Sequence, residues 1–405
     1  EEAQGKKAPT QRFVDNFARI YTPAVFIVAL LVAILPPLVA GASWHEWIYK
    51  ALVLLVIACP CALVISTPVT IVSGLAAAAR HGILIKGGVY LEEGHKLTWL
   101  ALDKTGTITH GKPVQTDFET LVDMDAVRCR SLAASLSGRS DHPVSRAISA
   151  ATVAIQTPVL AVESFEALPG RGVRGVIDGK RYALGNHRLI HDLNLCTPAY
   201  EAQIEALERL GKTVVLLADE HRVLALFAVA DTVKESSHAA IGELHRLGVK
   251  TVMLTGDNQF TADAIAQQVG IDQARGDLLP EDKLKAVEIF GGEGVVGMVG
   301  DGINDAPALA KAHIGFAMGA MGTDTAIETA DVALMDDDLN KIPAFVRLSR
   351  ATRSILVQNI SMALIIKCVF LILTLVGLGT MWMAVFADVG ASLLVVGNGL
   401  RLLRK

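Results

Sequence analysis

Four long apolar stretches constrain the folds that this chain can adopt. Each is long enough to cross a lipid bilayer, which takes about 20 residues of helix. They span residues 21–42, 47–74, 355–378 and 381–403. The first two are joined by a short loop and so are the last two, so we expect two helical hairpins in a membrane. The alternative interpretation is that these stretches are core helices of a soluble protein.

The distribution of charge orients the two hairpins. Lysine and arginine gather at the ends away from the short loops, at Lys6, Lys7, Arg12, Arg80, Lys86, Arg347, Arg350, Arg353, Arg401, Arg404 and Lys405. Because cytoplasmic loops carry such an excess, the middle region, 75–354, is predicted to lie in the cytoplasm. Five cysteines without a secreted-type spacing agree with a reducing compartment. The net charge of −4 argues against a nucleic-acid partner.

The run DKTGT, which begins at Asp103, is the first candidate for chemistry. It follows an apolar, strand-like segment at 97–102, and in open parallel sheets ligands bind beyond the carboxyl ends of the strands. A carboxylate at that position can attack a phosphoryl group and form an acyl phosphate. Lys104 would balance charge there, and Thr105 would supply a hydroxyl group. Gly106 would let the backbone approach a phosphate.

Three further polar clusters follow strand-like runs. They comprise Thr255, Gly256 and Asp257; Asp301, Asn304 and Asp305; and Asp231 with Thr232 after the run 224–230. A parallel sheet brings such strand ends to one edge, so we expect all three clusters beside Asp103. Asp301, with Asp103 and Thr105, would bind Mg²⁺, which takes one or two carboxylates together with phosphate and water. Lys283 would add a positive charge at the transferring phosphoryl group.

The region 110–223 separates the first of these strands from the later ones. It contains His142 followed by Pro143, and the glycines Gly170 and Gly172. A residue before proline has an extended backbone, which can present the His142 ring for stacking on a purine. The glycines would let a nucleotide come close to the backbone. The alternatives are a surface histidine and a tight turn.

The second apolar stretch carries Cys59-Pro60-Cys61 near its middle. Proline removes a backbone hydrogen bond and kinks a helix, and unwinding at Pro60 would turn both sulfurs to one side. Two thiolates select soft or borderline metals such as Cu(I), Zn or Cd over Na, K or Ca. The alternative is that both cysteines are small buried hydrophobic residues.

Two charged residues, Lys367 and Asp388, lie within the last two apolar stretches. Charges at mid-membrane are costly and usually pair. Counted from the outer helix ends at about 1.5 Å per residue, Lys367 and Cys59 lie about 18 Å deep and Asp388 about 13 Å. One layer could therefore hold them with Cys61. Two thiolates and one carboxylate are balanced by Lys367 and a divalent ion, whereas Cu(I) would leave the site one charge short in a low dielectric. The alternative is a salt bridge that only orients two helices.

These motifs together resemble those of the heavy-metal (type IB) P-type ATPases, and most of all the zinc/cadmium/lead exporters. The resemblance covers nearly the whole chain: CPC at 59–61, DKTGT at 103–107, HP at 142–143, TGDN at 255–258 and GDGINDAPAL at 300–309. It implies that Asp103 is the phosphorylated aspartate. It also implies ATP contacts for His142, Pro143, Gly170, Gly172 and Asn186. Lys367 and Asp388 resemble the zinc-group pattern, because copper exporters place Tyr-Asn and Met or Ser residues on these last helices.

The resemblance implies a membrane α-helical part with four spans in two hairpins. It adds a cytoplasmic α/β haloacid dehalogenase-like phosphorylation domain with an inserted α+β nucleotide-binding domain. The expected boundaries are 1–10 for a linker from an upstream actuator domain, 11–92 for two transmembrane helices with a cytoplasmic extension, 93–109 and 224–345 for the phosphorylation domain, 110–223 for the nucleotide-binding domain, and 346–405 for two transmembrane helices. The family's TGE-bearing actuator domain and upstream helices are not found, so we expect the carboxy-terminal portion of a pump.

One position departs from the family pattern. The nucleotide pocket of the family usually has an acidic residue five positions before the histidine of the His-Pro pair, where this chain has Ser137. The neighbouring Asp141 is a candidate substitute.

We therefore expect ATP-driven export of Zn²⁺, and also of Cd²⁺ and Pb²⁺, through an aspartyl-phosphate intermediate, with ATP and Mg²⁺ as cofactors and a role in metal resistance. The expected partners are the lipid bilayer, the divalent ion, and the missing actuator and upstream helices. The expected location is a bacterial inner membrane. Three alternatives stay open: a Cu⁺ exporter, a non-catalytic metal-binding fragment, and a membrane-anchored phosphatase of the haloacid dehalogenase type. Such phosphatases carry a second aspartate two residues after the nucleophile, where this chain has Thr105.

Overall fold

The structure, a computed structural model of the 405-residue chain, describes all residues except 1–7, 156, 301–302, 320–323, 377 and 405. The chain divides into two compact units. The helical unit comprises Glu1–Leu97, Ala330–Asp336 and Lys341–Lys405, and the α/β unit comprises Thr98–Thr329 and Asp337–Asn340.

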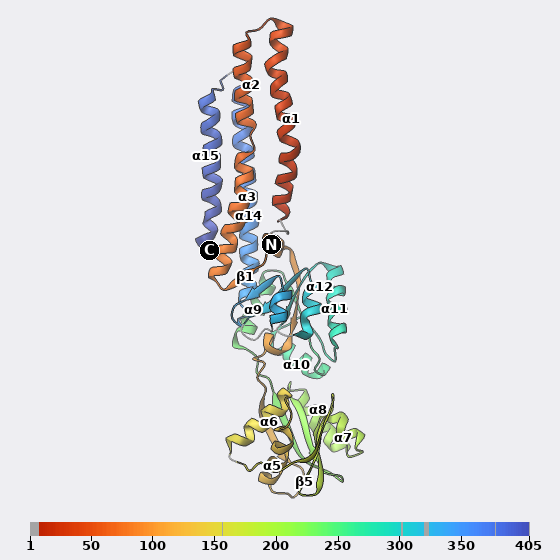
Figure 1. The fold of residues 1–405 in the computed structure, drawn as a ribbon. Coiled ribbons are helices and arrows are strands. Elements are labelled where there is room, and N and C mark those ends of the chain that lie inside the picture. Colours follow the sequence, from red (N-terminus) through yellow and green to blue (C-terminus); the bar gives the residue numbers. More distant parts are fainter. Residues whose placement is uncertain (1–7, 156, 301–302, 320–323, 377, 405) are drawn as a thin grey trace. The chain divides into compact units, whose positions relative to one another are not determined.

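Long helices dominate the helical unit (Figure 1). They are α1 (Pro9–Ala40), α2 (Trp44–Ala58), α3 (Cys61–Arg80), α14 (Lys341–Leu375) and α15 (Met381–Leu400). By length and composition, four segments of the described chain can cross a membrane: Pro9–Ala40, Trp44–Arg80, Lys341–Thr374 and Met381–Arg404. This confirms the four predicted spans in two hairpins. Helices α1 and α14 begin earlier than the apolar stretches that they contain, because their polar amino-terminal turns are also helical.

Shorter elements complete the helical unit. Strand β1 (Ile83–Ile85) pairs antiparallel with β13 (Val332–Leu334), and α4 (Gly88–Glu93) follows β1. Gly94 lies against Phe345 of α14, where an added Cβ would come within 2.5 Å of the ring. A glycine is therefore required for this close contact.

The second span is interrupted between α2 and α3. Cys59 has φ −56° and ψ 125°, outside the helical region, and the helix restarts at Cys61 with Pro60 as its N-cap residue. Pro60 cannot donate a backbone hydrogen bond, so the helical ladder stops there. The break also leaves the carbonyl groups of Ile57 and Cys59 available to other donors.

Small residues bring α3, α14 and α15 close together. Ala62, Ala363 and Ala391 form a buried cluster with Val395, in keeping with the small side chains that favour packing of membrane helices. Asn359 of α14 is fully buried and donates to the Val395 carbonyl at 3.1 Å. A side-chain amide therefore ties α14 to α15 within the span.

The first sheet of the α/β unit is parallel and carries the strands in the order β12 (Ile314–Met318), β11 (Val295–Gly300), β2 (Leu97–Asp103), β9 (Lys250–Leu254) and β10 (Gln273–Arg275). β2 pairs in parallel with β9, β9 with β10, and β11 with β12. The associated helices are α9 (Glu235–Arg246), α10 (Gln259–Val269), α11 (Pro280–Glu293), α12 (Ala306–Lys311) and α13 (Asp324–Thr329). Asp103, the last residue of β2, lies opposite Leu254, the last residue of β9. The expected edge for chemistry is therefore present.

The second sheet, with its helices, forms what we call the nucleotide lobe. Its strands run β3 (Val114–Thr120), β8 (Val223–Ala230), β7 (Thr213–Ala218), β6 (Lys180–Gly185), β5 (Gly172–Ile177) and β4 (Glu163–Leu168), and all neighbours pair antiparallel. Helices α5 (Ala126–Ser137) and α6 (Pro143–Ala154) share a core with one face of this sheet. Helices α7 (His187–Asp192) and α8 (Pro198–Glu208) share a second core with the other face.

The assignment of the run 224–230 to the phosphorylation domain is wrong. These residues form β8, which pairs with β3 and β7 inside the antiparallel sheet. The run is apolar throughout because β8 is buried on both faces: Phe227 faces the α5–α6 core and Leu226 the α7–α8 core. A strand covered on both faces looks the same in sequence whichever sheet contains it. The insertion therefore extends to Ala230.

Candidate functional site

The carboxyl end of β2 carries a buried cluster of charges. Asp103 is only 7% exposed and accepts a hydrogen bond from Lys283 Nζ of α11. The same ammonium group donates to Asp305 Oδ1 at 2.8 Å. Burial lowers the pKa of Lys283, but the charges of Asp103 and Asp305 outweigh this and raise it above its usual value. One lysine thus holds a positive charge between two carboxylates.

A tight turn follows Asp103. Gly106 has φ +72°, a left-handed conformation that favours glycine. The turn is closed by Thr109, whose backbone N–H donates to the Lys104 carbonyl at 3.1 Å. Lys234, only 7% exposed, donates from its ammonium group to the Gly106 carbonyl. Lys234 was not predicted from the sequence. The only signal for it is a lysine a few residues after the end of an apolar strand.

The cluster after β9 lies beside the turn. Lys104 forms an ion pair with Asp257, and Thr255 Oγ1 accepts a hydrogen bond from the Asp257 amide at 3.2 Å. Thr255 is buried and Gly256 is exposed. The structure therefore brings Thr255, Gly256 and Asp257 to the same sheet edge as Asp103.

The cluster after β11 is described only in part. Asp305 is buried and contacts Lys283, whereas Asn304 is exposed. Gly300 lies against Asp305, since an added Cβ would come within 2.7 Å of its carboxylate. Asp301 lies outside the described residues.

The third predicted cluster lies next to the turn rather than to Asp103 itself. Asp231 Oδ2 accepts a hydrogen bond from Thr109 Oγ1 at 2.5 Å, and the backbone N–H of His110 donates to the Thr232 carbonyl at 3.0 Å. Asp231 therefore supports the segment that follows the turn.

The nucleotide lobe contains a cavity of about 370 Å³. Four of the residues predicted to contact a nucleotide line it: His142, Gly170, Gly172 and Asn186. Pro143 begins α6 beside His142 and is not among the lining residues. Asn186 Nδ2 donates to the Gly170 carbonyl at 3.0 Å, which fixes one wall. This volume lies in the range of small-molecule pockets, about 300–1,000 Å³.

Ser137 and Asp141 do not take the place of an acidic pocket residue. Ser137 is fully buried and donates to the Ala134 carbonyl at 3.3 Å. Asp141 pairs with Arg146 at 2.9 Å, and its side chain is fully exposed. Neither lines the cavity. Arg171 and Ser140 line it instead, and neither was predicted.

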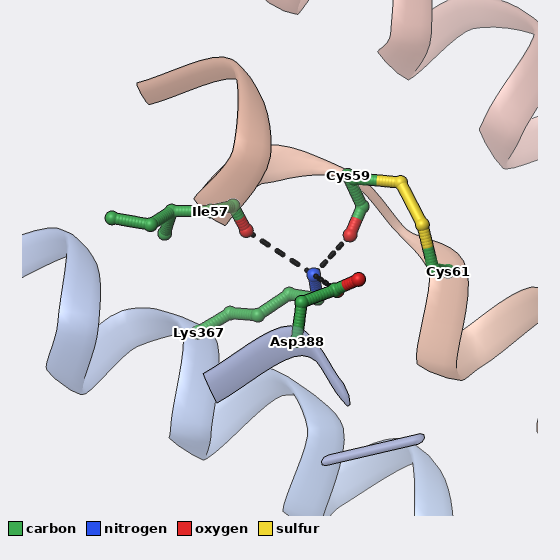
Figure 2. Close-up of a disulfide and its surroundings, with 5 residues drawn as sticks. All are labelled: Ile57, Cys59, Cys61, Lys367 and Asp388. Atoms are coloured by element: carbon green, nitrogen blue, oxygen red, sulfur yellow. Dashed lines mark hydrogen bonds and ion pairs between the residues drawn. A yellow bond between two sulfur atoms is a disulfide. The ribbon is translucent and has the colours of Figure 1, made fainter. Parts of the chain in front are cut away.

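A second candidate site lies at the break between α2 and α3 (Figure 2). Lys367 Nζ donates to the Cys59 carbonyl, to the Ile57 carbonyl at 3.1 Å, and to Asp388 Oδ1 at 3.2 Å. The Lys367 and Asp388 side chains are mostly buried, at 17% and 19% exposure. The two carbonyls are those that the helix break leaves available.

The two sulfurs lie on one side of the break and are joined as a disulfide (Figure 2). They and the Asp388 carboxylate have their ligand atoms within 4.8 Å of one another. The two cysteines can bind a metal as thiolates only after the disulfide is reduced. With the cysteines reduced, the group offers two sulfur ligands, one carboxylate and an adjacent ammonium group.

Comparisons with known proteins agree with both parts of the chain. The family model of the haloacid dehalogenase-like hydrolases matches residues 97–313. A probable cadmium-transporting ATPase of Staphylococcus aureus (strain MRSA252) is 49% identical over all of this chain and 57% of its own length. A zinc/cadmium/lead-transporting P-type ATPase of Escherichia coli (strain K12) is 47% identical over all of this chain and 54% of its own length. The chain therefore spans about half the length of the curated relatives that it matches.

Solved structures show the same likeness. A zinc-transporting PIB-type ATPase in the E2.Pi state is 47% identical, with a TM-score of 0.83, over all of this chain and 66% of that one. The catalytic domain of the CPx-ATPase CopB-B is 25% identical, with a TM-score of 0.54, over 66% of this chain and 97% of that domain.

Proposed function

The chain belongs to the haloacid dehalogenase-like hydrolases and, within them, to the heavy-metal P-type ATPases, and on that premise we propose that the protein carrying it exports Zn²⁺ across a membrane. Cd²⁺ and Pb²⁺ are the proposed further substrates, since relatives that share 47–49% of the sequence are named as transporters of these metals. Export is driven by ATP through an aspartyl phosphate on Asp103.

The observation that carries this proposal is the grouping of Asp388 with Cys59 and Cys61, beside Lys367. Two thiolates and a carboxylate favour a borderline metal over a hard one. Their three negative charges are balanced by one divalent ion and one lysine. A monovalent Cu(I) would leave one negative charge without compensation in a low dielectric, which costs several kcal/mol. The site therefore favours Zn²⁺, Cd²⁺ or Pb²⁺ over Cu(I).

Phosphoryl transfer is assigned to the end of β2. A carboxylate oxygen of Asp103 attacks the γ-phosphorus of ATP, the bond to the bridging oxygen breaks, and ADP leaves. Lys283 is held close enough to neutralise charge on the transferring group, and catalysis of this reaction is mainly positioning and electrostatics. Thr105, two residues after Asp103, carries no carboxylate to activate water. The aspartyl phosphate should therefore persist long enough to drive transport.

The residues at this edge also suit Mg²⁺. The carboxylates of Asp103 and Asp305 converge on one ammonium group, and oxygen ligands of this kind fit a hard cation. We assign Asp103, Thr105 and Asp301 to hold Mg²⁺, which when bound would offset the charge of the phosphate oxygens.

The cavity of the nucleotide lobe is proposed to hold ATP. Its glycine-lined wall, Gly170 to Gly172, gives a nucleotide access to the backbone, and His142 offers a ring for stacking. Pro143 would act by holding His142 at the start of α6.

The proposed setting is a bacterial inner membrane with the α/β unit in the cytoplasm, as the lysine and arginine distribution indicates. Because the relatives are nearly twice as long as this chain, we propose that an actuator domain and upstream helices act with it in the whole protein.

The direct test of the transport site is metal binding to reduced protein in detergent. The Asp388→Asn and Cys59→Ser variants should each bind one equivalent of Zn²⁺ less than the unmodified protein. Cys368→Ser, at an exposed cysteine, is the matched control and should bind as much Zn²⁺ as the unmodified protein. Cu(I) binding that exceeds Zn²⁺ binding, and that persists in Asp388→Asn, would instead support the copper exporter.

A further inference from the structure

A second cluster of metal-ligating side chains lies in the nucleotide lobe. His187 begins α7, Cys196 lies in the loop after α7, and Glu201 is on α8. One ligand atom from each lies within 4.8 Å of the others. These residues belong neither to the membrane site nor to the end of β2, and the proposed transport cycle does not use them.

The distances within this cluster lie within about 0.5 Å of those around a zinc ion. His187 Nε2 lies 3.1 Å from Cys196 Sγ and 3.9 Å from Glu201 Oε1, and Cys196 Sγ lies 3.8 Å from Glu201 Oε1. Tetrahedral zinc binds nitrogen and oxygen at about 2.0–2.2 Å and sulfur at about 2.3 Å, which sets the ligand atoms roughly 3.4–3.6 Å apart. Shifts of less than about 1 Å would therefore complete the coordination.

Local structure fixes the starts of the two helices beside the cluster and leaves the site open. Asn186 and Thr197 are the N-cap residues of α7 and α8, and each accepts a hydrogen bond from the backbone of its own helix. The His187 and Glu201 side chains are 40% and 52% exposed, so an ion can enter from solvent. Water can supply the fourth ligand, as in zinc sites with three protein ligands.

We propose that His187, Cys196 and Glu201 bind one borderline divalent cation, Zn²⁺ or Cd²⁺, and that this ion adjusts the nucleotide cavity. The mixed nitrogen, sulfur and oxygen set excludes Mg²⁺ and Ca²⁺, which take oxygen ligands. Binding converts the Cys196 thiol to a thiolate and releases its proton to solvent.

The link to the nucleotide runs through α7. Asn186 precedes His187 and donates to the Gly170 carbonyl at 3.0 Å. Asp192, the last residue of α7, forms an ion pair with Arg171. Both Gly170 and Arg171 line the cavity. An ion that ties His187 to α8 therefore fixes the helix that holds this wall.

The test uses Co²⁺ as a spectroscopic probe in the reduced full chain carrying Cys59→Ser and Cys61→Ser, which removes the thiolates of the membrane site. One equivalent of Co²⁺ should give a thiolate charge-transfer band that Zn²⁺ abolishes by displacement. Cys196→Ser should remove the band, and His187→Asn or Glu201→Gln should weaken binding at least about tenfold. His221→Asn, an exposed histidine between β7 and β8 of the same lobe, is the matched control and should change nothing.

ADP binding in the same background provides the second readout. Zn²⁺ should change the ADP dissociation constant at least about threefold, and this change should disappear in Cys196→Ser. Unaltered ADP affinity in that variant without metal shows that the lobe is folded. A missing band, or one that survives Cys196→Ser, would overturn the site. Equal ADP affinity with and without Zn²⁺ would overturn its link to the nucleotide cavity.

Discussion

Lys367 Nζ lies 3.2 Å from Asp388 Oδ1 while it also donates to the Ile57 and Cys59 carbonyls at the helix break. One ammonium group thus satisfies both the irregular backbone and the buried carboxylate. In the proposed transport cycle, Lys367 would be the counter-charge of Asp388 before a divalent ion binds and part of the charge balance of the site afterwards, so the same residue could serve both states.

This pairing predicts strong coupling between the two side chains. Lys367→Met leaves a buried carboxylate without its counter-charge, and Asp388→Asn leaves a buried ammonium group, so each should destabilise the metal-free protein. The double variant removes both charges and should lose less stability than the sum, by about 1–3 kcal/mol. Thermal unfolding in detergent with chelator measures this difference. Strict additivity would contradict the pairing.

Lys283 is predicted to be essential for phosphorylation of Asp103. Lys283→Met removes the charge that contacts both Asp103 and Asp305, and the rate of phosphoenzyme formation should fall at least about 100-fold. Lys285→Met, on the same helix but exposed and paired with Asp282, is the matched control. Rapid-quench labelling with radioactive ATP gives both rates. Similar rates of phosphoenzyme formation in the two variants would show that Lys283 does not take part in phosphoryl transfer.

The protonation of Lys283 is predicted to be constant near neutral pH. Its folded-state pKa is raised by Asp103 and Asp305, so its stabilising charge is fully present below the unfolded pKa of about 10.4. That contribution is lost only as pH rises through the higher folded value. Phosphorylation rates measured between pH 6 and 9 should therefore show the same pH profile in wild type and in Lys283→Arg. An alkaline limb present only in wild type would contradict this.

Gly300 is predicted to keep Asp305 in place. An alanine Cβ at this position would lie within 2.7 Å of the Asp305 carboxylate, so Gly300→Ala should displace that carboxylate from Lys283 and slow phosphorylation at least about tenfold. Gly292→Ala is the control, because nothing lies within 4 Å of its added Cβ. The comparison of labelling rates, with circular dichroism to verify folding, decides the outcome. Equal rates would show that Asp305 has room to adjust.

Asn186 is predicted to contribute to nucleotide affinity beyond its role as an N-cap residue. Asn186→Ala removes both the cap of α7 and the hydrogen bond to Gly170, and ADP affinity should fall about tenfold. Thr197→Ala removes a comparable cap, from α8, without touching the cavity. Both should lose about 1 kcal/mol of stability. Calorimetry without metal measures ADP affinity separately from the loss of stability. Equal ADP affinities in the two variants would show that Asn186 acts only as an N-cap residue.

Much of the site could be predicted because local rules fix it. The spans follow from length and apolarity, and the break at Pro60 follows from its missing N–H. The depth estimate places Lys367 and Asp388 about one helical turn apart, and the structure brings their charged groups to 3.2 Å. Lys104 and Asp257 form an ion pair because parallel strands end at one edge of the sheet.

Other features depend on contacts that sequence does not reveal. The strand at 223–230 is apolar on both faces, so its composition is compatible with either sheet. Only its pairing with β3 and β7 shows that it belongs to the antiparallel sheet. Lys234 reaches Gly106 across 128 positions of the chain. The grouping of His187 with Cys196 and Glu201 requires the turn between two short helices, which no residue spacing specifies.

Phosphoenzyme formation from radioactive ATP, in membranes containing the full protein that carries this chain, is the most direct test of Zn²⁺ export through Asp103. Zn²⁺ and Cu(I) are compared under reducing conditions, with Asp103→Asn as the control. We expect labelling that requires Zn²⁺ and that is lost in Asp103→Asn and in Asp388→Asn. Labelling that requires Cu(I), or that persists without Asp103, would contradict this expectation.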